Sequence, residues 1–275
     1  KPDWAAGLRE TWEPGEPAAR ARLREFLAED LGSYDDSRDE PSTGSTSRLS
    51  PRLRWGEISP YQVWHETAEA RGTGAKAASA GRFLSEIGWR EYGQNIINQF
   101  PDYGSRPYKP EFMAFPWREG PEVEGELRAW CEGRTGYPIV DAGMRQLWAT
   151  GWMHNRVRML VASLLTKHLL IDWRRGEAWF WDTLVDADYG QNVMNWQWNA
   201  GAGADANQFA RIMAPLLQSV RFSAADYIRQ WVPELAHLSD EEIHDPVLAV
   251  RGYPRPIVDH AEGRARALAA WAMVR

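Results

Sequence analysis

The sequence predicts one all-α domain with long functional loops, and three observations support this fold class. Apolar residues recur at the three- and four-residue spacing of an amphipathic helix, first at Leu23, Phe26, Leu27 and Leu31. No sustained alternation of apolar and polar residues, the pattern of a half-buried strand, competes with that spacing. The 275 residues suffice for one large domain, which would bury roughly 75% of the surface of its unfolded chain.

Caps and turn formers separate the helices in the first part of the chain. The first apolar stripe predicts a helix over about 17–31, and the Ser-, Asp- and Gly-rich stretch 33–47 should be a loop. Ser59 and Gln62 form a capping box around Pro60, which predicts the start of the next helix.

A longer helix should run from Ala75 to Phe100, because apolar residues line one stripe of it and Pro101 ends it. The stretch that follows, up to Pro121, is rich in proline and aromatic residues, so we expect a loop there. Helices should resume near Glu122.

The second half should contain three more helices and a loop that forms a site. Pro138 opens and Gly151 closes the first helix, 154–170 forms the second and 174–185 forms the third. Residues 186–206 are rich in Asn, Gly and Ala between Trp and Asp residues, which predicts a loop.

Charge and cysteine content exclude some classes of protein. The chain has 32 Lys and Arg against 38 Asp and Glu, and this net charge of −6 argues against a wholly basic nucleic-acid coat protein. Residues 46–176 nevertheless hold 18 basic and 14 acidic residues, so this region is the candidate face for a polyanion. The single Cys131 excludes an internal disulfide framework and a Cys-rich metal site, and it fits a reducing, cytoplasmic setting. The most apolar stretch, 159–171, is too short to span a membrane, so we expect no membrane contact. We also expect no metal centre, since His65 and Glu66 lack a second His at the spacing that a zinc-binding helix needs.

Two short motifs could bind a charged ligand. Residues 46–51 place three hydroxyls and one guanidinium before a proline, and such a segment can wrap a phosphate. The Ser-capped start of a helix fits the same residues. Asp186 and Asp188 follow a helix and can bind a cation, a metal or the polar edge of a cofactor, or can be a solvated pair at a helix end.

An arginine and two tryptophans leave similar alternatives. Arg158 lies on an otherwise apolar helix and would need a carboxylate such as Asp186 if it were buried, which would be a structural ion pair. Tryptophan is unusually frequent, with 16 Trp against 9 Tyr and 8 Phe. Trp196 and Trp198 would point the same way in an extended segment. An exposed pair can stack on nucleic-acid bases, whereas a buried pair is ordinary core.

Taken together, these motifs resemble the flavin-binding helical domain of the photolyase/cryptochrome family. The resemblance runs nearly from end to end of the chain, and the matching stretches are 46–51, 89–92, 133–141, 151–159, 172–174, 186–188 and 196–198. It implies an all-α domain that holds FAD in a U shape at the base of a cavity, which damaged DNA enters.

The resemblance also implies residues that bind FAD. It places Tyr34 and residues 46–50, here called the hydroxyl segment, near the pyrophosphate. It places residues 186–188, here called the acidic run, near the flavin and ribose, and the amide of Asn192 opposite flavin N5. The residues so assigned are Tyr34, Thr46, Ser47, Arg48, Leu49, Ser50, Arg158, Asp186, Ala187, Asp188 and Asn192.

Two further groups of residues are implied by the resemblance. Around a flipped pyrimidine dimer it places Glu86, Trp89, Arg90, Asn155, Arg156, Met159 and Trp198. As a chain of indoles that carries electrons from the surface to the photoexcited flavin it places Trp196, Trp173 and Trp117, which with Asn192 form the catalytic set. Family members specific for the pyrimidine–pyrimidone adduct have a His pair, whereas here Asn155 follows a single His154.

Two features depart from the family pattern. The family commonly has Asn where this chain has Ala214 before Pro215, which we expect to affect packing more than chemistry. The α/β antenna domain that usually comes first is absent from this chain, so we interpret 1–16 as the remnant of a linker and 17–275 as the helical FAD-binding catalytic domain.

The function that the resemblance implies is light-driven repair of UV-damaged DNA. The expected enzyme is a monomeric, cytoplasmic deoxyribodipyrimidine photolyase, in which excited reduced FAD donates an electron that splits a cyclobutane pyrimidine dimer. One alternative is a cryptochrome-type blue-light receptor that binds FAD and signals without repair. A Trp-rich helical scaffold without a cofactor is the other alternative.

Overall fold

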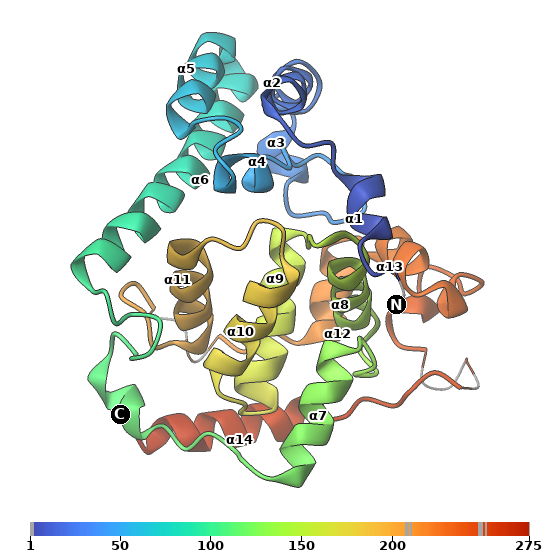
Figure 1. Cartoon of the computed structure of the whole chain (residues 1–275). Coiled ribbons are helices and arrows are strands. Elements are labelled where there is room, and N and C mark those ends of the chain that lie inside the picture. The colour runs from blue at the N-terminus through green and yellow to red at the C-terminus, as the bar shows by residue number, and fades with distance from the viewer. Residues whose placement is uncertain (1–2, 207–208, 210, 247–249, 251, 275) are drawn as a thin grey trace.

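Helices are the only regular elements in the computed structural model of the chain, which describes residues 3–206, 209, 211–246, 250 and 252–274 (Figure 1). This confirms the predicted all-α fold class. The helices are α1 (Ala6–Thr11), α2 (Glu16–Glu25), α3 (Tyr34–Ser37), α4 (Ser50–Arg54), α5 (Pro60–Ala70), α6 (Gly74–Gln99), α7 (Pro121–Cys131), α8 (Pro138–Thr150), α9 (Asn155–Ser163), α10 (Trp173–Thr183), α11 (Tyr189–Ala200), α12 (Pro215–Arg221), α13 (Ala225–Trp231) and α14 (His260–Ala272). Two π-helical turns, Phe26–Asp30 and Leu164–His168, continue α2 and α9, and short 3-10 turns lie at Pro110–Ala114, Pro233–Leu235 and Glu242–His244.

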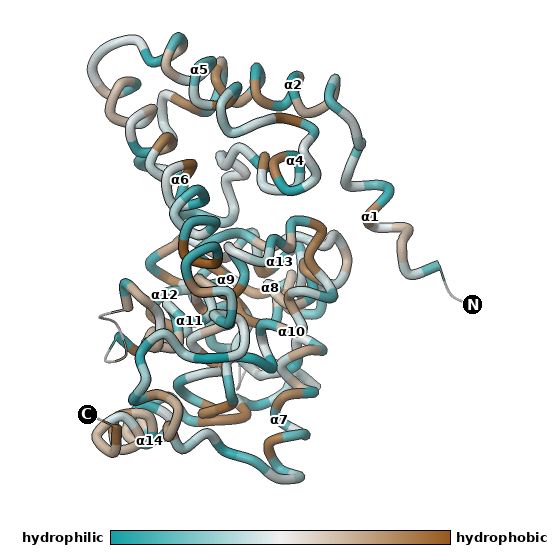
Figure 2. The backbone as a smooth tube through the Cα atoms, turned by 60° about the vertical axis from the view of Figure 1, so that its left-hand side comes forward, coloured by the Kyte–Doolittle hydropathy of each residue, from teal (hydrophilic) through white to brown (hydrophobic). Residues whose placement is uncertain are grey.

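The helices form an upper part, made of α2 to α5 and the first half of α6, and a lower part, made of α7 to α14 (Figure 1). Helix α6 leads from one part to the other, and Figure 2 shows the same separation from a second direction. Each part has its own apolar core. The upper core includes Leu23, Phe26, Leu31, Val63 and Phe83.

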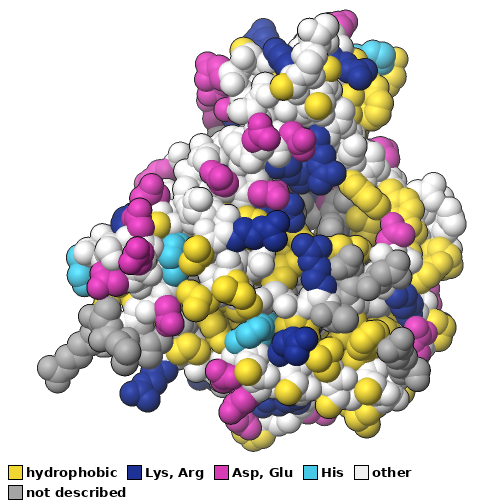
Figure 3. Space-filling view, turned by 180° about the vertical axis from the view of Figure 1, so that it is seen from behind, with side chains coloured by type: hydrophobic (Ala, Val, Ile, Leu, Met, Phe, Trp, Pro, Cys, Tyr) yellow, Lys and Arg dark blue, Asp and Glu magenta, His cyan; other side chains and the backbone are white. Residues whose placement is uncertain are grey.

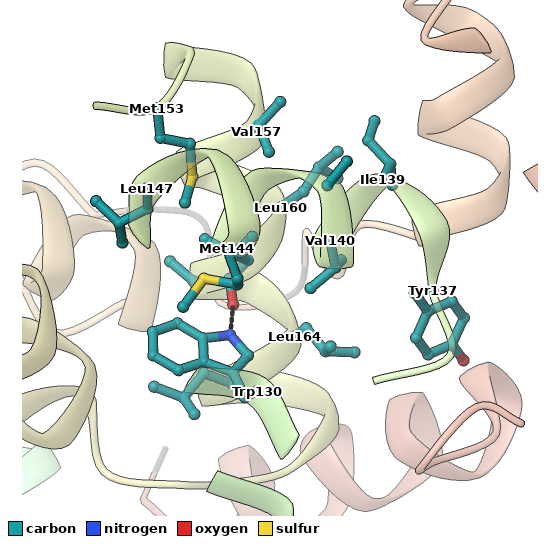
Figure 4. Close-up of a cluster of buried hydrophobic side chains, with 14 of the residues drawn as sticks. Trp130, Tyr137, Ile139, Val140, Met144, Leu147, Met153, Val157, Leu160 and Leu164 are labelled. Atoms are coloured by element: carbon teal, nitrogen blue, oxygen red, sulfur yellow. Dashed lines mark hydrogen bonds between the residues drawn. The ribbon is translucent and has the colours of Figure 1, made fainter. Parts of the chain in front are cut away.

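The lower core is the larger one and is built around α8, α9 and α10. Trp130 lies at its centre, fully buried, and its indole N–H donates a hydrogen bond to the carbonyl oxygen of Val161 (2.9 Å; Figure 4). Met144, Leu160 and Leu164 belong to the same cluster (Figure 4). A buried Trp that satisfies its N–H adds apolar area without leaving an unpaired donor.

The predicted loop over 186–206 is wrong, because α11 occupies most of it. Asp188 caps the helix by accepting a hydrogen bond from the backbone N–H of Gln191 (3.1 Å), and Gly201 ends it in the left-handed conformation (φ +86°). Asn and Gly lower helix propensity, but packing of α11 against α6, α9 and α10 outweighs that effect.

Other sequence predictions agree with the structure to within a few residues. The helices predicted over 17–31, 75–100, 138–151, 154–170 and 174–185 are present, and the capping box before α5 is formed. The stretch 33–47 contains the short helix α3, which the sequence analysis had missed. The segment 1–16 contains α1, which packs against the end of α8, where the Trp12 indole N–H donates to the carbonyl oxygen of Thr150 (2.7 Å). None of the helices in the described part of the chain combines the length and the apolar character that a membrane span requires.

Candidate functional site

A cavity of about 540 Å³ lies between the upper and lower parts. Its walls come from α3, α4 and α6 above, from α9, α10 and α11 below, and from the connecting segments 46–50 and 186–188. This volume falls in the usual range for sites that hold a cofactor or a small ligand. On the rear of the molecule, a hollow below the upper part is edged by Lys and Arg and by hydrophobic side chains (Figure 3).

Every residue predicted to contact FAD or the extruded bases lines this one cavity. These are Tyr34, Thr46, Ser47, Arg48, Leu49, Ser50, Glu86, Trp89, Arg90, Asn155, Arg156, Arg158, Met159, Asp186, Ala187, Asp188, Asn192 and Trp198. Trp196 lines it too, whereas Trp173 and Trp117 lie outside it. The fold therefore brings together side chains that are far apart in the sequence.

The hydroxyl segment holds one buried, unpaired hydroxyl and one guanidinium that lines the cavity. Arg22 of α2 fixes its backbone by donating to the carbonyl oxygens of Thr46 (2.9 Å) and Ser47 (3.0 Å). The Thr46 hydroxyl is buried and has no hydrogen-bond partner. Arg48, in a left-handed backbone conformation (φ +51°), stacks its guanidinium over the Trp152 ring (5.0 Å to the centroid).

No carboxylate among the described residues forms an ion pair with Arg48, which is open to the cavity. The surrounding protein desolvates the guanidinium, and together with the nearby charge of Arg22 this lowers the pKa of Arg48. A guanidinium without a counter-charge, two residues from an unpaired hydroxyl in the same cavity wall, matches the needs of a phosphate or pyrophosphate group. This end of the cavity therefore fits the pyrophosphate of FAD.

The alternative of a Ser-capped helix start does not hold for this segment. Helix α4 begins at Ser50, and its N-cap residue is Leu49, which has no side-chain cap. The Ser50 hydroxyl instead accepts a hydrogen bond from the indole N–H of Trp152 (3.3 Å).

An ion pair lies at the lower wall, as expected from the sequence. Arg158 donates from both terminal nitrogens to Asp186, at 3.2 Å and 2.8 Å, and from Nε to the carbonyl oxygen of Met153 (2.7 Å). The Asp186 side chain is only 2% exposed. Such a bidentate pair holds a charged guanidinium in a fixed orientation beside the cavity.

Asp188 caps helix α11 with one carboxylate oxygen, and its other oxygen lies near Arg90. Its Oδ1 accepts hydrogen bonds from the backbone N–H of Gln191 (3.1 Å) and the side chain of Gln94 (2.6 Å). Its Oδ2 lies 3.9 Å from Arg90. Within the acidic run, Asp188 therefore caps a helix and Asp186 forms an ion pair, and both residues line the cavity.

Asn192 is held by a carboxyl group that the sequence analysis did not identify. Its amide nitrogen donates to Oε1 (2.8 Å) and to the carbonyl oxygen (3.0 Å) of Glu177. Burial raises the pKa of Glu177, against the lowering effect of this hydrogen bond. Because Glu177 uses the amide nitrogen, the Asn192 carbonyl oxygen remains as the acceptor that can meet a ligand.

The two tryptophans of α11 do not point the same way, contrary to the expectation for an extended segment. A helix turns by about 100° per residue, so residues two apart lie about 160° from each other around it. Trp196 is buried (2% exposed), with Phe180 and Trp130 as ring neighbours at 5.0 Å and 6.2 Å. Trp198 is half-buried at the cavity.

The three predicted electron-carrying indoles share one core. Trp173 is 1% exposed and lies in the same apolar cluster as Trp196, and half-buried Trp117 packs against that cluster. Helix α10 packs tightly against Trp196 at Gly176, where an added Cβ would lie 2.2 Å from Cη2 of the indole.

Several cavity residues were missed by sequence reasoning. Arg38, Arg54, Phe180 and Gln191 line the cavity, and Glu177 orients Asn192. The only sequence signal for Arg38 was its place four residues after Tyr34, over whose ring it lies (5.2 Å). Within the described ranges, no group of three His, Cys, Asp or Glu side chains could hold a metal ion.

The fold and the cavity define a helical cofactor-binding domain. The profile of the family described as the FAD binding domain of DNA photolyase matches residues 83–273, so this chain belongs to that family.

Individual relatives agree with this assignment. The chain is 50% identical over 290 residues to the deoxyribodipyrimidine photo-lyase of Agrobacterium fabrum, with all of this chain and 59% of that protein covered. The crystal structure of a bacterial class III photolyase from Agrobacterium tumefaciens matches with a TM-score of 0.93 and 50% identity, over 100% of this chain and 59% of that one. A cryptochrome from Synechocystis matches with a TM-score of 0.86 and 32% identity, over 94% and 56%. The chain thus spans a little over half the length of these relatives.

Proposed function

We propose that this protein splits cyclobutane pyrimidine dimers in UV-damaged DNA, using light absorbed by bound FAD. The observation that carries the proposal is the composition of this cavity. It joins an end with an unpaired guanidinium, a fixed ion pair, and two accessible indoles, Trp89 and Trp198. The 50% identity to a protein named deoxyribodipyrimidine photo-lyase supports the same reaction.

The cofactor end of the cavity would be formed by the hydroxyl segment with Arg48 and by the pair of Arg158 with Asp186. Arg48 and the Thr46 hydroxyl would gain the anionic partner that each lacks. The chemistry that bound FAD supplies is a light-driven electron, which opens the cyclobutane ring and then returns, so that no net redox change occurs. The protein supplies shape, charge and orientation.

The other residues of the cavity would act on the substrate. Trp89 and Trp198 would stack on bases that have left the duplex, a contact worth about 1–3 kcal/mol per base. Glu86 and Asn155 would accept and donate hydrogen bonds at the base edges, while Met159 would exclude water from the contact. Asn192, held by Glu177, would keep its carbonyl oxygen at a fixed place in the cavity.

The proposal also covers the oligomeric state, the DNA partner, the cellular location and the domain boundaries. We infer that the protein acts as a monomer on damaged duplex DNA in the cytoplasm, in keeping with its single cysteine. Residues 17–275 would form the catalytic domain, and residues 1–16 a linker from an antenna domain.

The deciding experiment is a repair assay. Protein loaded with reduced FAD is mixed with an oligonucleotide that contains one thymine dimer, and the restored thymines are counted after blue light and after darkness. We expect repair only in the illuminated sample. Denaturation should release FAD from the protein. A protein that binds FAD without restoring thymines would instead be a photoreceptor, the alternative that its likeness to a cryptochrome supports. Release of FMN or of no flavin would contradict the cofactor assignment.

We further propose that Trp196, Trp173 and Trp117 supply electrons to the flavin. Trp196→Phe should block photoreduction of oxidised flavin in the presence of an external thiol, because phenylalanine is much harder to oxidise than tryptophan. Dimer repair by chemically reduced protein should stay largely intact, because Trp196 is buried and would not stack on DNA. Parallel loss of both activities would place Trp196 in the substrate site or make its role purely structural.

A further inference from the structure

Two neighbouring residues, Arg38 and Asp39, reach opposite walls of the cavity. They follow helix α3 in the upper part. Arg38 donates from Nη1 to Oε1 of Glu86 on α6 (2.5 Å), and its side chain is only 8% exposed. Asp39 accepts a hydrogen bond from Nη2 of Arg156 on α9 in the lower part. One dipeptide therefore ties α6 to α9.

The four side chains form a continuous ionic chain. Nε of Arg38 lies 3.6 Å from Oδ1 of Asp39, which joins the two ion pairs in the middle. Burial acts to raise the pKa of Asp39, but the hydrogen bond from Arg156 and the charges of Arg156 and Arg38 outweigh it, and the pKa is lowered. The carboxylate is therefore charged at neutral pH, and the order Glu86, Arg38, Asp39, Arg156 alternates in sign.

Three of the four residues in this ionic chain line the cavity, and Asp39 is the exception. Glu86, Arg38 and Arg156 line the cavity, whereas Asp39 does not. Arg156 also packs over the Phe222 ring (5.7 Å to the centroid) and reaches Sδ of Met159 (3.5 Å). Asp39 thus holds a guanidinium that belongs to the wall facing the proposed substrate.

We propose that Glu86, Arg38, Asp39 and Arg156 form an ionic strap that sets the spacing of the two cavity walls for an extruded pair of bases, with Asp39 as a positioning residue. The inference rests on the proposed function and extends it to the recognition of damaged DNA. A strap of this kind would distinguish damaged from undamaged DNA by geometry, because a base pair that stays in the duplex never contacts both walls.

Charge and geometry make opposite predictions for the removal of Asp39. Loss of a negative charge beside arginines strengthens attraction to phosphates, and this effect is the same for damaged and undamaged DNA. Loss of positioning weakens only the complex in which the bases occupy the cavity. The ratio of the two affinities therefore isolates the positioning role from a change in net charge.

The experiment compares Asp39→Asn with Asp36→Asn in flavin-loaded protein. Asp36 is exposed on α3, does not line the cavity and loses the same charge. Dissociation constants are measured by fluorescence anisotropy for one oligonucleotide with and without a thymine dimer, at fixed salt. For Asp39→Asn we expect equal or tighter binding of undamaged DNA, about tenfold weaker binding of damaged DNA and unchanged flavin content. Asp36→Asn should keep the discrimination ratio of the wild type.

A second variant, Arg38→Lys, tests the same proposal in case Asp39→Asn does not fold correctly. Arg38→Lys keeps the charge, but one ammonium group cannot replace a guanidinium that meets Glu86 and Asp39 with different nitrogens. Its discrimination ratio should fall as well, and Asp39→Glu should recover part of the loss seen with Asp39→Asn. An unchanged ratio in Asp39→Asn, or in Arg38→Lys if the first variant loses flavin, would overturn the strap. Wild-type protein without any preference for damaged DNA would instead refute the proposed function itself.

Discussion

Charged side chains in the cavity wall differ in whether the fold supplies each with a partner of opposite charge. Asp186 and Arg158 neutralise each other through two hydrogen bonds, and the carboxylate is almost completely buried. Arg48 has no such partner in the described part of the chain and is left for a ligand. The first arrangement favours stability and orientation, whereas the second leaves a cation available to an anionic ligand.

Asp186→Asn should therefore destabilise the protein even without flavin. The variant leaves the Arg158 guanidinium half-buried without its counter-charge, and breaking a buried pair in this way costs about 3–5 kcal/mol. Urea unfolding of the flavin-free protein measures the loss, and the flavin content of the purified variant should fall in parallel. Asp182→Asn, an exposed site on α10, is the matched control and should change neither quantity.

His154 makes stability depend on pH. It is buried at the start of α9, where Nδ1 accepts a hydrogen bond from the backbone N–H of Arg156 (3.2 Å). Burial lowers its pKa from 6.5 to about 4, and the charges of Arg156 and Arg158 add to this, while Asp39 opposes it. The unfolded chain thus binds a proton more readily than the folded one between pH 6.5 and 4, so stability is lost as the pH falls through this window.

His154→Asn should reduce that loss, because asparagine keeps the helix cap but does not titrate. Between pH 7 and pH 4.5 the free energy of unfolding should fall by about 2 kcal/mol less than in the wild type. Urea titrations at the two pH values give the difference. His168, whose pKa is also lowered to about 4, remains in the variant and should preserve part of the acid sensitivity. Equal acid sensitivity in the two proteins would show that His154 does not titrate in this range.

Helices α10 and α11 show what the sequence can and cannot predict. Apolar periodicity and caps predicted α2, α5, α6, α8, α9 and α10, because these signals lie within each segment. Helix α11 was missed since its Asn and Gly residues suggest a loop. Asp188 with Gln191, and Gly201 as a C-cap, were the local signals that could have identified it.

The same distinction applies to the site. The resemblance to a known family supplied cavity residues from motifs scattered over the chain, and all of those assigned to FAD or DNA line the cavity. Arg38, Asp39 and Glu177 could not be found in this way. Their importance lies in contacts across 48, 117 and 15 residues of sequence, which no local pattern specifies.

The crossing of α10 and α11 depends on one glycine. At Gly176, a Cβ would lie 2.2 Å from Cη2 of Trp196 and 2.6 Å from Cδ2 of Leu165, and both of these side chains are buried. Gly176→Ala should therefore cost about 1–3 kcal/mol of stability through overpacking, despite the better helix propensity of alanine. Thermal or urea unfolding measures the cost.

Gly125→Ala on α7 is the control for that experiment. An added Cβ there meets no atom within 4 Å, so the same exchange should stabilise the helix by about 0.5–1 kcal/mol. Opposite signs for the two variants would confirm close packing at Trp196. A stabilising effect at Gly176 would mean that the helices can separate without cost.

The molecule as a whole combines a net charge of −6 with a cationic cavity. Acidic residues dominate the first 45 residues, with 11 Asp and Glu against 6 Lys and Arg, whereas the region 46–176 is net basic. Net charge alone would predict repulsion from DNA, but attraction to phosphates depends on the local potential where the arginines gather (Figure 3). A polyanion should therefore bind on one face of an acidic protein.

DNA affinity should accordingly fall with rising salt, since each phosphate that an arginine neutralises releases counterions and adds about −0.9 to the slope of log K against log salt. Trp198→Ala should leave this slope unchanged, because the indole carries no charge. It should weaken binding of dimer-containing DNA by about 1–3 kcal/mol, while undamaged DNA, whose bases stay stacked in the duplex, loses little. Trp64→Ala, an indole 45% exposed on α5 outside the cavity, controls for the loss of any accessible tryptophan. Equal weakening of both DNAs by Trp198→Ala would mean that this indole supports the fold or a general contact, and that damage is recognised elsewhere in the cavity.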